Sequence, residues 1–415
     1  MKFAHMADCH LGGWSDPTLR EINSECFETA LQMCIDEEVD FILISGDLFD
    51  TSRPAFEVML RAVSKIKEVK DAGIRVYVIE GSHDFSATGM TMLRLLEKTG
   101  LFSRVSKRQP SDDDKLRLRF MEDEETGAKI TGLIGRMGVL ETKLYQSLDR
   151  DALRREEGFK IFMFHTALSE LKPEVYEHAE AMPVTLLPNG FDYYAGGHVH
   201  KNAVHEWSGY GPIVFPGPTM PADFRELERL TPGGFYINTV ESGKIETEWR
   251  ALDLYQIMKI QIDANDMNPT SVESEIEKHI SNDLRNRIVL LRVEGTLKIG
   301  KPSDIDFRRL TSLMREKGAR TVKKSTGSLT SAEYREFKVT ASSREDLEDK
   351  IIREHAGQLK IKGMGKKREI QLTKNLINTL VESRVPDEKK KDYQIRLESD
   401  ILTVLGIKDR WEEFA

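Results

Sequence analysis

Closely spaced cysteine pairs are missing from this sequence. Its three cysteines are Cys9, Cys26 and Cys34, and their spacing excludes zinc fingers and dithiol redox motifs. So few thiols also argue against a secreted fold held together by disulfides. We therefore interpret the three residues as reduced thiols of a cytoplasmic protein.

Long apolar segments and a dominant sign of charge are missing as well. No apolar stretch approaches the roughly 20 residues that cross a bilayer. Residues 1–5 lead directly into a predicted strand, which leaves no room for a signal peptide. The 61 basic and 69 acidic residues give a net charge of −8. If nucleic acid is a partner, it is therefore held by local patches and by metal rather than by bulk charge.

The first part of the sequence contains a regular alternation of strand and helix patterns. Residues 41–44 form an apolar run without polar alternation, which is typical of a strand buried on both faces. Helix patterns at 17–38 and 54–72 separate this run from strand patterns at 2–7 and 74–79. The order predicts an α/β fold in which a layered β-sheet is flanked by helices.

Five of the predicted strands end in aspartate or histidine. The residues that follow them are Asp8 and His10; Asp47; Ser82, His83 and Asp84; His165; and His198 and His200. Because ligands of α/β sheets bind at the carboxyl ends of the strands, we expect these side chains to meet at one edge of one sheet. Imidazole mixed with carboxylate suits first-row divalent metals such as manganese, iron or zinc.

The cluster as a whole predicts a site for two metal ions. Two ions need a bridging carboxylate, and Asp47, on a central strand, is the natural bridge. Taken singly, Asp47 is equally a turn residue that caps the next helix, and any one histidine is equally a structural residue. His5 points away from the cluster by strand alternation and is interpreted as a packed histidine. A serine or cysteine triad is excluded, because no candidate nucleophile occupies a strand-to-helix elbow.

The chain is too long for one ordinary domain, and two or three are expected from its 415 residues. After residue 252 the pattern changes to a small α+β domain, and from residue 343 it becomes helical and strongly charged. The expected domains are 1–252, 253–342 and 343–415. The last segment has amphipathic helices, expected at 343–357, 368–384 and 389–405, that either form a small bundle or lie against a partner.

Several short motifs connect the predicted metal site to a known family. The motifs Asp8-x-His10, Gly46-Asp47, Gly81-Ser-His-Asp84, His165 and Gly197-His-x-His200 resemble those of the calcineurin-like metallophosphoesterases. Within that family, the segments 3–12, 46–54 and 197–201 resemble the Mre-eleven/SbcD nucleases, the nuclease subunits of the double-strand-break repair complex. The resemblance is dense in motifs over the first domain and looser beyond it.

The resemblance implies a manganese-dependent DNA exo/endonuclease that hydrolyses phosphodiester bonds at DNA ends and uses two divalent metal ions. It implies that Asp8, His10, Asp47 and His200 hold one ion, and that Asp47, Ser82, His165 and His198 hold the other. His83 matches the catalytic histidine, which stabilises the transition state or protonates the leaving oxygen. Asp84 is placed to orient that imidazole or to make a turn hydrogen bond. Arg53, in the second motif, is expected to bind substrate.

Two positions depart from the family pattern. Ser82 stands where the family usually has asparagine, whose amide oxygen reaches further and binds a metal better than a neutral hydroxyl does. Asp50 stands where many members have a second histidine linked to exonuclease activity, although SbcD-like members also carry aspartate there. Ser82 supports an alternative interpretation, a DNA-end-binding scaffold with weakened catalysis, and a phosphatase of the same fold is a further alternative.

The same resemblance implies partners. It predicts binding of double-stranded DNA ends and single strands, with DNA contacts from the second domain. It also predicts docking of an SMC-like ATPase of the Rad-fifty/SbcC type on the terminal helices. A homodimer is expected to pair through a surface that includes Met59, Met92, Leu95 and Leu96. The expected location is the cytoplasm of a prokaryotic-type cell, in association with the nucleoid and without membrane attachment.

Overall fold

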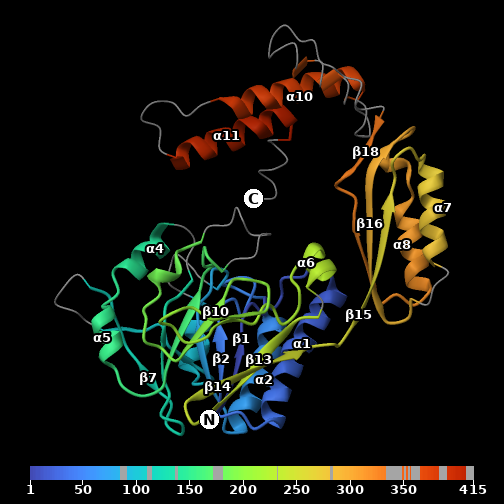
Figure 1. Cartoon of the computed structure of the whole chain (residues 1–415). Coiled ribbons are helices and arrows are strands. Elements are labelled where there is room, and N and C mark those ends of the chain that lie inside the picture. The colour runs from blue at the N-terminus through green and yellow to red at the C-terminus, as the bar shows by residue number, and fades with distance from the viewer. Residues whose placement is uncertain are drawn as a thin grey trace. The chain divides into compact units, whose positions relative to one another are not determined.

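The computed structural model describes most of the chain (Figure 1). The described residues are 1–84, 91–109, 115–135, 139–171, 181–230, 232–280, 284–332, 348–349, 352–353, 356, 365–382 and 390–407. They belong to two compact units, Met1–Glu333 and Tyr334–Ala415. The first unit contains the predicted first domain and most of the predicted second domain, so the division into three domains stays a prediction.

The first sheet is built around the apolar run at residues 41–44. Its strand order is β14-β13-β1-β2-β3-β4, in which β1 to β4 are parallel and β13 and β14 pair in antiparallel fashion. All five residues of β2 are buried, as expected for a strand without polar alternation. The bounds are β1 Lys2–Met6, β2 Phe41–Ser45, β3 Arg75–Ile79, β4 Ser103–Arg104, β13 Gly234–Glu241 and β14 Lys244–Ala251.

A second sheet contains the strands of the middle of the chain. Its order is β11-β12-β10-β9-β8-β7, with β8, β9, β10 and β12 parallel and antiparallel strands at both edges. The bounds are β7 Met121–Glu122, β8 Lys129–Gly132, β9 Lys160–His165, β10 Tyr193–Gly197, β11 Ala203–His205 and β12 Ile213–Phe215. Shorter elements of this region are β5 Arg108–Gln109, β6 Arg117–Leu118, α4 Val139–Gln146, α5 Arg150–Arg155 and η2 Val184–Leu186.

The two sheets pack face to face. Phe3 of the first sheet stacks on Phe41 with ring centroids 5.1 Å apart, and it contacts Tyr193 of the second sheet edge-on, also at 5.1 Å. Ile130, Ile161 and other apolar side chains of the second sheet complete this core. The predicted α/β fold class is confirmed, with two layers of sheet.

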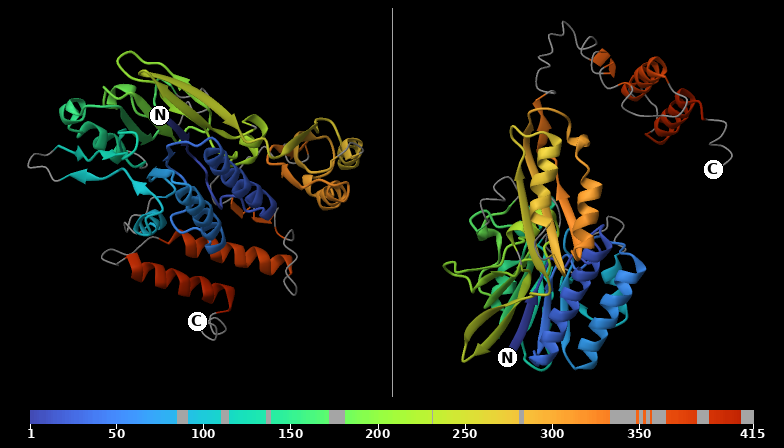
Figure 2. Two further views of the ribbon diagram at one scale, coloured as in Figure 1. Left: turned by 90° about the horizontal axis from the view of Figure 1, so that it is seen from below. Right: turned by 90° about the vertical axis from the view of Figure 1, so that its right-hand side faces the viewer.

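Helices cover the outer face of the first sheet. Figure 2 shows α1 (Pro17–Asp36) and α2 (Phe56–Asp71) side by side there, and the short α3 (Met92–Lys98) contributes to the same core. α1 begins at the predicted position because the Asp16 side chain accepts hydrogen bonds from two backbone N–H groups of its first turn, and a proline occupies its first position.

A third, smaller sheet follows in the first unit. Its strands are all parallel, with β16 at the centre: β15 Gln256–Asp263, β16 Arg287–Leu297, β17 Thr321–Ser325 and β18 Leu329–Ser331. Helices α7 (Pro269–Ile280) and α8 (Phe307–Glu316) cover one face (Figure 2), and η3 (Pro302–Asp304) precedes α8. On the other face, Ile288 and Leu290 belong to the same apolar core as the buried side chains of α1. The strand and helix positions agree with the sequence pattern, but parallel strands that alternate with helices make this region α/β rather than the α+β domain that was predicted.

The second unit contains two helices, α10 (Lys366–Val381) and α11 (Lys390–Leu405), that pack against each other (Figure 1). They correspond to the last two predicted helices. The predicted helix at 343–357 lies largely outside the described residues, although residues 348–349 and 352–353 are helical. Within the described part of the chain, no helix is both long and apolar enough to cross a membrane.

Candidate metal centre

The aspartates and histidines of the predicted metal site lie at the ends of strands from two different sheets. Asp8 and Asp47 follow β1 and β2 of the first sheet, whereas His165 and His198 come from β9 and β10 of the second. The two sheets are joined here, because both Asp8 carboxylate oxygens accept the backbone N–H of His198 at 3.0 Å. The expectation of one sheet edge was wrong, since parallel strands of two stacked sheets end at the same place.

The backbone of the site is strained. Asp8, His10, Asp47 and His198 have φ angles of 52°, 42°, 50° and 79°. They are four of the eight non-glycine residues with positive φ in the described part of the chain. Such a conformation costs about 1–3 kcal/mol for each residue and persists only where the surroundings impose it. Its repetition at four neighbouring positions indicates a functional site.

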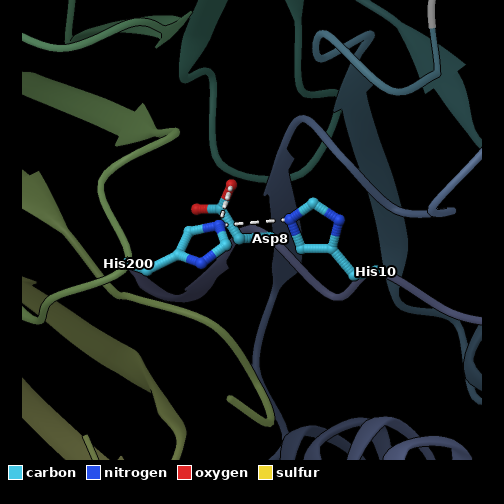
Figure 3. A group of neighbouring side chains, drawn as sticks. All are labelled: Asp8, His10 and His200. Carbon is cyan, nitrogen blue, oxygen red and sulfur yellow. Dashed lines mark hydrogen bonds and ion pairs between the residues drawn. The ribbon is translucent and has the colours of Figure 1, made fainter. Parts of the chain in front are cut away.

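One group of possible metal ligands consists of Asp8, His10 and His200 (Figure 3). The Nε2 atoms of His10 and His200 lie 3.1 Å apart, and His200 Nε2 lies 3.7 Å from Asp8 Oδ1. The other ring nitrogen of His200, Nδ1, is 2.7 Å from Oε1 of Glu226. A carboxylate on Nδ1 leaves Nε2 available to a metal ion.

A second group consists of Asp8, Asp47 and His165. His165 Nε2 lies 3.1 Å from Asp47 Oδ2, and its Nδ1 lies 2.8 Å from the Ser45 carbonyl oxygen, which fixes the ring. The His198 ring packs against His165 with ring centroids 5.2 Å apart. Burial, and then the neighbouring His165 charge, lower the pKa of His198 to about 4. A lowered pKa favours the unprotonated ring, which is the form of histidine that binds a metal ion.

Opposite charges dominate the electrostatics of both groups. Burial opposes a charge on His165, but the carboxylates of Asp47 and Asp8 outweigh burial and raise the pKa of His165 to about 10. Burial also opposes the charge on His200, whose pKa is nevertheless raised to about 10 by hydrogen bonds to carboxylates, first that of Asp8. For Asp47, burial raises the pKa, but the charges of His165 and His10 and the hydrogen bonds from His165 and the His83 backbone together lower it by more, so the net shift is downward. The carboxylates therefore favour a positive charge beside them, which protons on His165 and His200 supply and which metal ions would supply once those rings lose their protons.

The residues present fit two divalent cations. In each of the two groups, the ligand atoms lie within 4.8 Å of one another, and Asp8, Asp47 and His165 are at most 2% exposed. Burial of several ionisable groups is costly unless counter-charges or metal ions pair with them. The glycines at positions 46 and 197 leave room for the His165 ring, because a Cβ at Gly46 or Gly197 would collide with that ring.

His83 and Asp84 have different environments. His83 lies at the rim of the centre with its side chain 47% exposed, and its Nδ1 is 2.9 Å from the backbone oxygen of Asp50. The Asp84 carboxylate is buried and accepts hydrogen bonds from the backbone N–H groups of Leu48, Phe49 and Gly81. Of the two roles considered for Asp84, these contacts favour the turn hydrogen bond over orientation of the His83 ring.

Comparisons with known proteins agree with this geometry. A model of the calcineurin-like phosphoesterase family matches residues 1–202. The DNA double-strand break repair protein Mre11 of Sulfurisphaera tokodaii is 30% identical over 305 residues, which are 70% of this chain and 73% of that protein. This chain belongs to the Mre11 family of calcineurin-like phosphoesterases. The predicted family and enzyme class, a metal-dependent phosphoesterase, are thereby confirmed.

Two other relatives of this Mre11-family chain have lower sequence identity to it. Mre11 of Archaeoglobus fulgidus is 23% identical over 75% of this chain and 71% of its own length. The uncharacterized metallophosphoesterase YhaO of Bacillus subtilis is 27% identical over 60% of each chain. A solved dimetal phosphatase from Danio rerio matches with a TM-score of 0.41 and 13% identity, over 61% of this chain and 96% of that one.

Ser82 lies inside the centre of this Mre11-family chain. Its hydroxyl is half-buried and donates a hydrogen bond to Asp47 Oδ2 at 3.3 Å. The side chain is therefore close enough to contact an ion held by Asp47 and His165. A neutral hydroxyl is nevertheless a weak metal donor, so its role as a ligand stays a prediction.

Replacing Ser82 with asparagine is expected to strengthen binding of the second ion. An amide oxygen is a better and longer-reaching donor than a hydroxyl. The manganese concentration that gives the half-maximal cleavage rate should therefore fall by roughly 10-fold, the scale on which changes around a metal alter its affinity. A manganese titration of the rate, with bound metal counted in parallel, measures this. Ser82→Ala is the control and should shift the titration the other way. An asparagine variant that needs as much manganese and cuts no faster would contradict the assignment.

Two contributors to this centre were missed by sequence reasoning. Glu226 and the Ser45 carbonyl hold the Nδ1 atoms of His200 and His165. No sequence signal connects Glu226 with a histidine 26 positions away, because the contact depends on how a short helix folds back. His5, by contrast, is a packed histidine as predicted: it is fully buried and contacts Tyr193 Oη and Ser45 Oγ, both at 3.0 Å.

Proposed function

We propose that this chain is a manganese-dependent DNA exo/endonuclease that hydrolyses phosphodiester bonds at DNA ends during double-strand-break repair. The names of its Mre11 relatives support the process, and the mixture of imidazole and carboxylate donors supports manganese. Asp8, His10, Asp47 and His200 would hold one ion, and Asp47, Ser82, His165 and His198 the other. Such ions lower the pKa of a water and polarise the phosphoryl group. His83, at the rim, stabilises the transition state or protonates the leaving oxygen.

The observation that favours a nuclease over a phosphatase is a basic cavity beside the metal centre. Its volume is about 970 Å³, and six cationic side chains line it: Arg94, Lys98, Arg104, Lys107, Arg108 and Arg119. Two carboxylates, Glu80 and Glu97, also line it, and both are ion-paired to Arg104. The lining therefore has an excess of positive charge, which suits several phosphates rather than one.

This basic cavity adjoins the metal centre through the backbone. Glu80 lies two residues before Ser82, and the Glu80 carbonyl accepts the N–H of Gly135 at 2.8 Å. Gly135 in turn packs against the His165 ring, because a Cβ there would collide with it. When the scissile phosphate of a DNA strand lies at the metal centre, neighbouring phosphates of the same DNA strand can thus lie in the cavity. Arg53, exposed on the loop after β2, offers a further positive charge for substrate binding.

Charge reversal in the basic cavity is expected to weaken DNA binding. We expect Arg108→Glu with Arg119→Glu to lower the affinity for a single-stranded oligonucleotide at least about 10-fold. The slope of log affinity against log salt concentration should become shallower by about one for each phosphate contact that is lost. Fluorescence anisotropy at several salt concentrations measures both. Hydrolysis of bis(p-nitrophenyl) phosphate, which needs only the metal centre, should not change.

The matched control is Lys67→Glu with Lys70→Glu, the same change of charge in the last turns of α2, where both side chains are exposed. Equal loss of affinity in both pairs would mean that bulk charge, not the cavity, binds DNA. Manganese-loaded protein that hydrolyses the small diester and never cleaves DNA would favour the phosphatase alternative. DNA binding without hydrolysis of either substrate would favour the scaffold.

A homodimer that pairs through α2 and α3 is supported by exposed apolar side chains on these helices. Leu95 is 58% exposed, and Met59 and Met92 are half-buried. Phe56 and Leu60, which sequence analysis did not single out, are 69% and 53% exposed. Leu96 is only 4% exposed and packs in the core of its own chain, so it is not part of this surface. Light scattering tests the proposal, and a monomer at micromolar concentration would refute it.

Docking of an SMC-like ATPase on the terminal helices is supported by the surface of α10 and α11. Among their described side chains, no apolar one is buried, and Leu380, Val381 and Ile395 are 56%, 67% and 56% exposed. Amphipathic helices with uncovered apolar faces need a partner to lie against. Removal of residues 343–415 should abolish co-purification with the ATPase, and an unchanged complex would refute this role.

A further inference from the structure

The short helix α6 (Phe224–Arg229) contacts the metal centre on one side. Oε1 of Glu226 lies 2.7 Å from Nδ1 of His200, the imidazole whose Nε2 faces Asp8 and His10. Oε2 of the same carboxylate accepts the backbone N–H of Ala222 at 2.7 Å. Both oxygens of Glu226 are thus engaged, which holds this side chain, and with it the His200 ring, in one orientation.

The opposite side of α6 contacts the third sheet. Arg292, on β16, forms a two-point ion pair with Glu228: Nε to Oε1 at 2.9 Å and Nη2 to Oε2 at 2.5 Å. Its guanidinium also lies 5.1 Å from the centre of the Phe224 ring. Lys259, on β15, donates to the backbone oxygen of Glu228 at 2.5 Å. Two strands of the third sheet therefore hold α6 by three separate contacts.

Residues 226 and 228 point to opposite sides because they are about 200° apart around a helix. In Figure 1, α6 lies beside the metal-binding sheets and next to β15 and β16. The helix is firmly placed between them: Leu227 is fully buried in the core, and the Asp223 side chain caps the helix by accepting the Glu226 N–H at 2.8 Å. Because both sides of this short helix are held, we expect it to move as one body rather than to bend.

We propose that α6 couples the position of the third sheet to the orientation of His200, and thereby to the affinity of the metal centre. Arg292 is a positioning residue that acts through Glu228, α6 and Glu226, although it touches neither metal ligands nor substrate. The inference rests on the proposed metal site but not on DNA as the substrate. When a ligand draws the third sheet away, the contact between Glu226 and His200 weakens and the ion bound by Asp8, His10 and His200 is held less tightly.

The structure provides a matched control for Arg292. Arg320, beside β17, also links the third-sheet region to the rest of the first unit, through a two-oxygen ion pair with Glu25 of α1 at 3.1 and 2.9 Å. The side chains of Arg292 and Arg320 differ little in exposure, at 19% and 29%. Glu25 contacts no metal-ligand side chain, so loss of this pair should leave the metal centre unchanged.

Manganese affinity of the full-length variants, measured by isothermal titration calorimetry, tests the proposal. Arg292→Ala should weaken binding about 10-fold, the lower end of the range for loss of contacts behind metal ligands, and Glu226→Ala should weaken it about 10- to 100-fold. Arg320→Ala should bind manganese like the unaltered chain. Arg292→Lys, which keeps the charge without the two-point geometry, should lie between, and it replaces Arg292→Ala if that variant does not fold.

The double variant decides whether the coupling passes through Glu226. If α6 carries it, Arg292→Ala should add little to the loss already caused by Glu226→Ala, because the two residues act on one contact. Additive losses, or equal affinities of Arg292→Ala and Arg320→Ala, would overturn the proposal. A chain that binds manganese in this pattern but cleaves no DNA would refute the proposed function and leave the coupling intact.

Discussion

Replacement of Asp47 by asparagine is expected to reduce DNA cleavage by about 10²- to 10³-fold, the scale on which loss of one electrostatic group lowers catalysis. Asp47 reaches both halves of the centre, as does Asp8, which belongs to both ligand groups: the Asp47 Oδ2 lies 3.1 Å from His165 Nε2 and 3.8 Å from His10 Nε2. Its Oδ1 accepts the backbone N–H of His83 at 2.8 Å. Asparagine keeps the shape but removes the charge that binds cations from both sides. Cleavage of a labelled duplex and bound manganese per chain measure the loss.

The control for this variant is Asp36→Asn, because Asp36 is exposed at the end of α1 and belongs to none of the groups of possible metal ligands among the described residues. It should cleave DNA like the unaltered chain.

Exhaustive chelation of the unaltered chain should abolish cleavage, and manganese should restore it better than magnesium, since imidazole donors suit manganese more than magnesium. Full activity after chelation would refute a metal-dependent mechanism.

Replacement of His83 by alanine is expected to lower the rate of DNA cleavage about 10²- to 10⁴-fold, the usual contribution of a general acid or base. His83 belongs to neither ligand group that contains Asp8, although it lies in a third possible group with His10 and Asp50. Its ring centroid is 4.8 Å from that of His10 in an edge-on contact. Bound manganese and DNA affinity should therefore change little. Single-turnover cleavage beside metal counting separates the two effects.

The chemical role of His83 can be resolved with a substrate that needs no leaving-group proton. If His83 protonates the leaving oxygen, hydrolysis of bis(p-nitrophenyl) phosphate should suffer far less than cleavage of DNA, because p-nitrophenolate leaves without a proton. If His83 stabilises the transition state, both rates should fall together. Loss of both ions in His83→Ala would show that the residue is a ligand instead.

The positions of the candidate metal ligands could be predicted from the sequence alone. Asp8, Asp47 and His165 each follow a short apolar run, and a buried strand that ends in a polar residue is a local pattern. The start of α1 at Asp16 and Pro17 was predictable for the same reason, since capping involves residues a few positions apart. The family motifs are equally local, which is why the resemblance could be found before the fold was known.

The tertiary structure decided what depends on residues that are distant in the sequence. Only the packing of two sheets places His198 against Asp8, 190 positions earlier. Only the folding of α6 places Glu226 on His200 and Glu228 on Arg292. The sequence determined the strands and the ligand side chains at their ends, because short-range patterns specify these. The contacts that orient those side chains arise from long-range packing, so the structure alone could assign them.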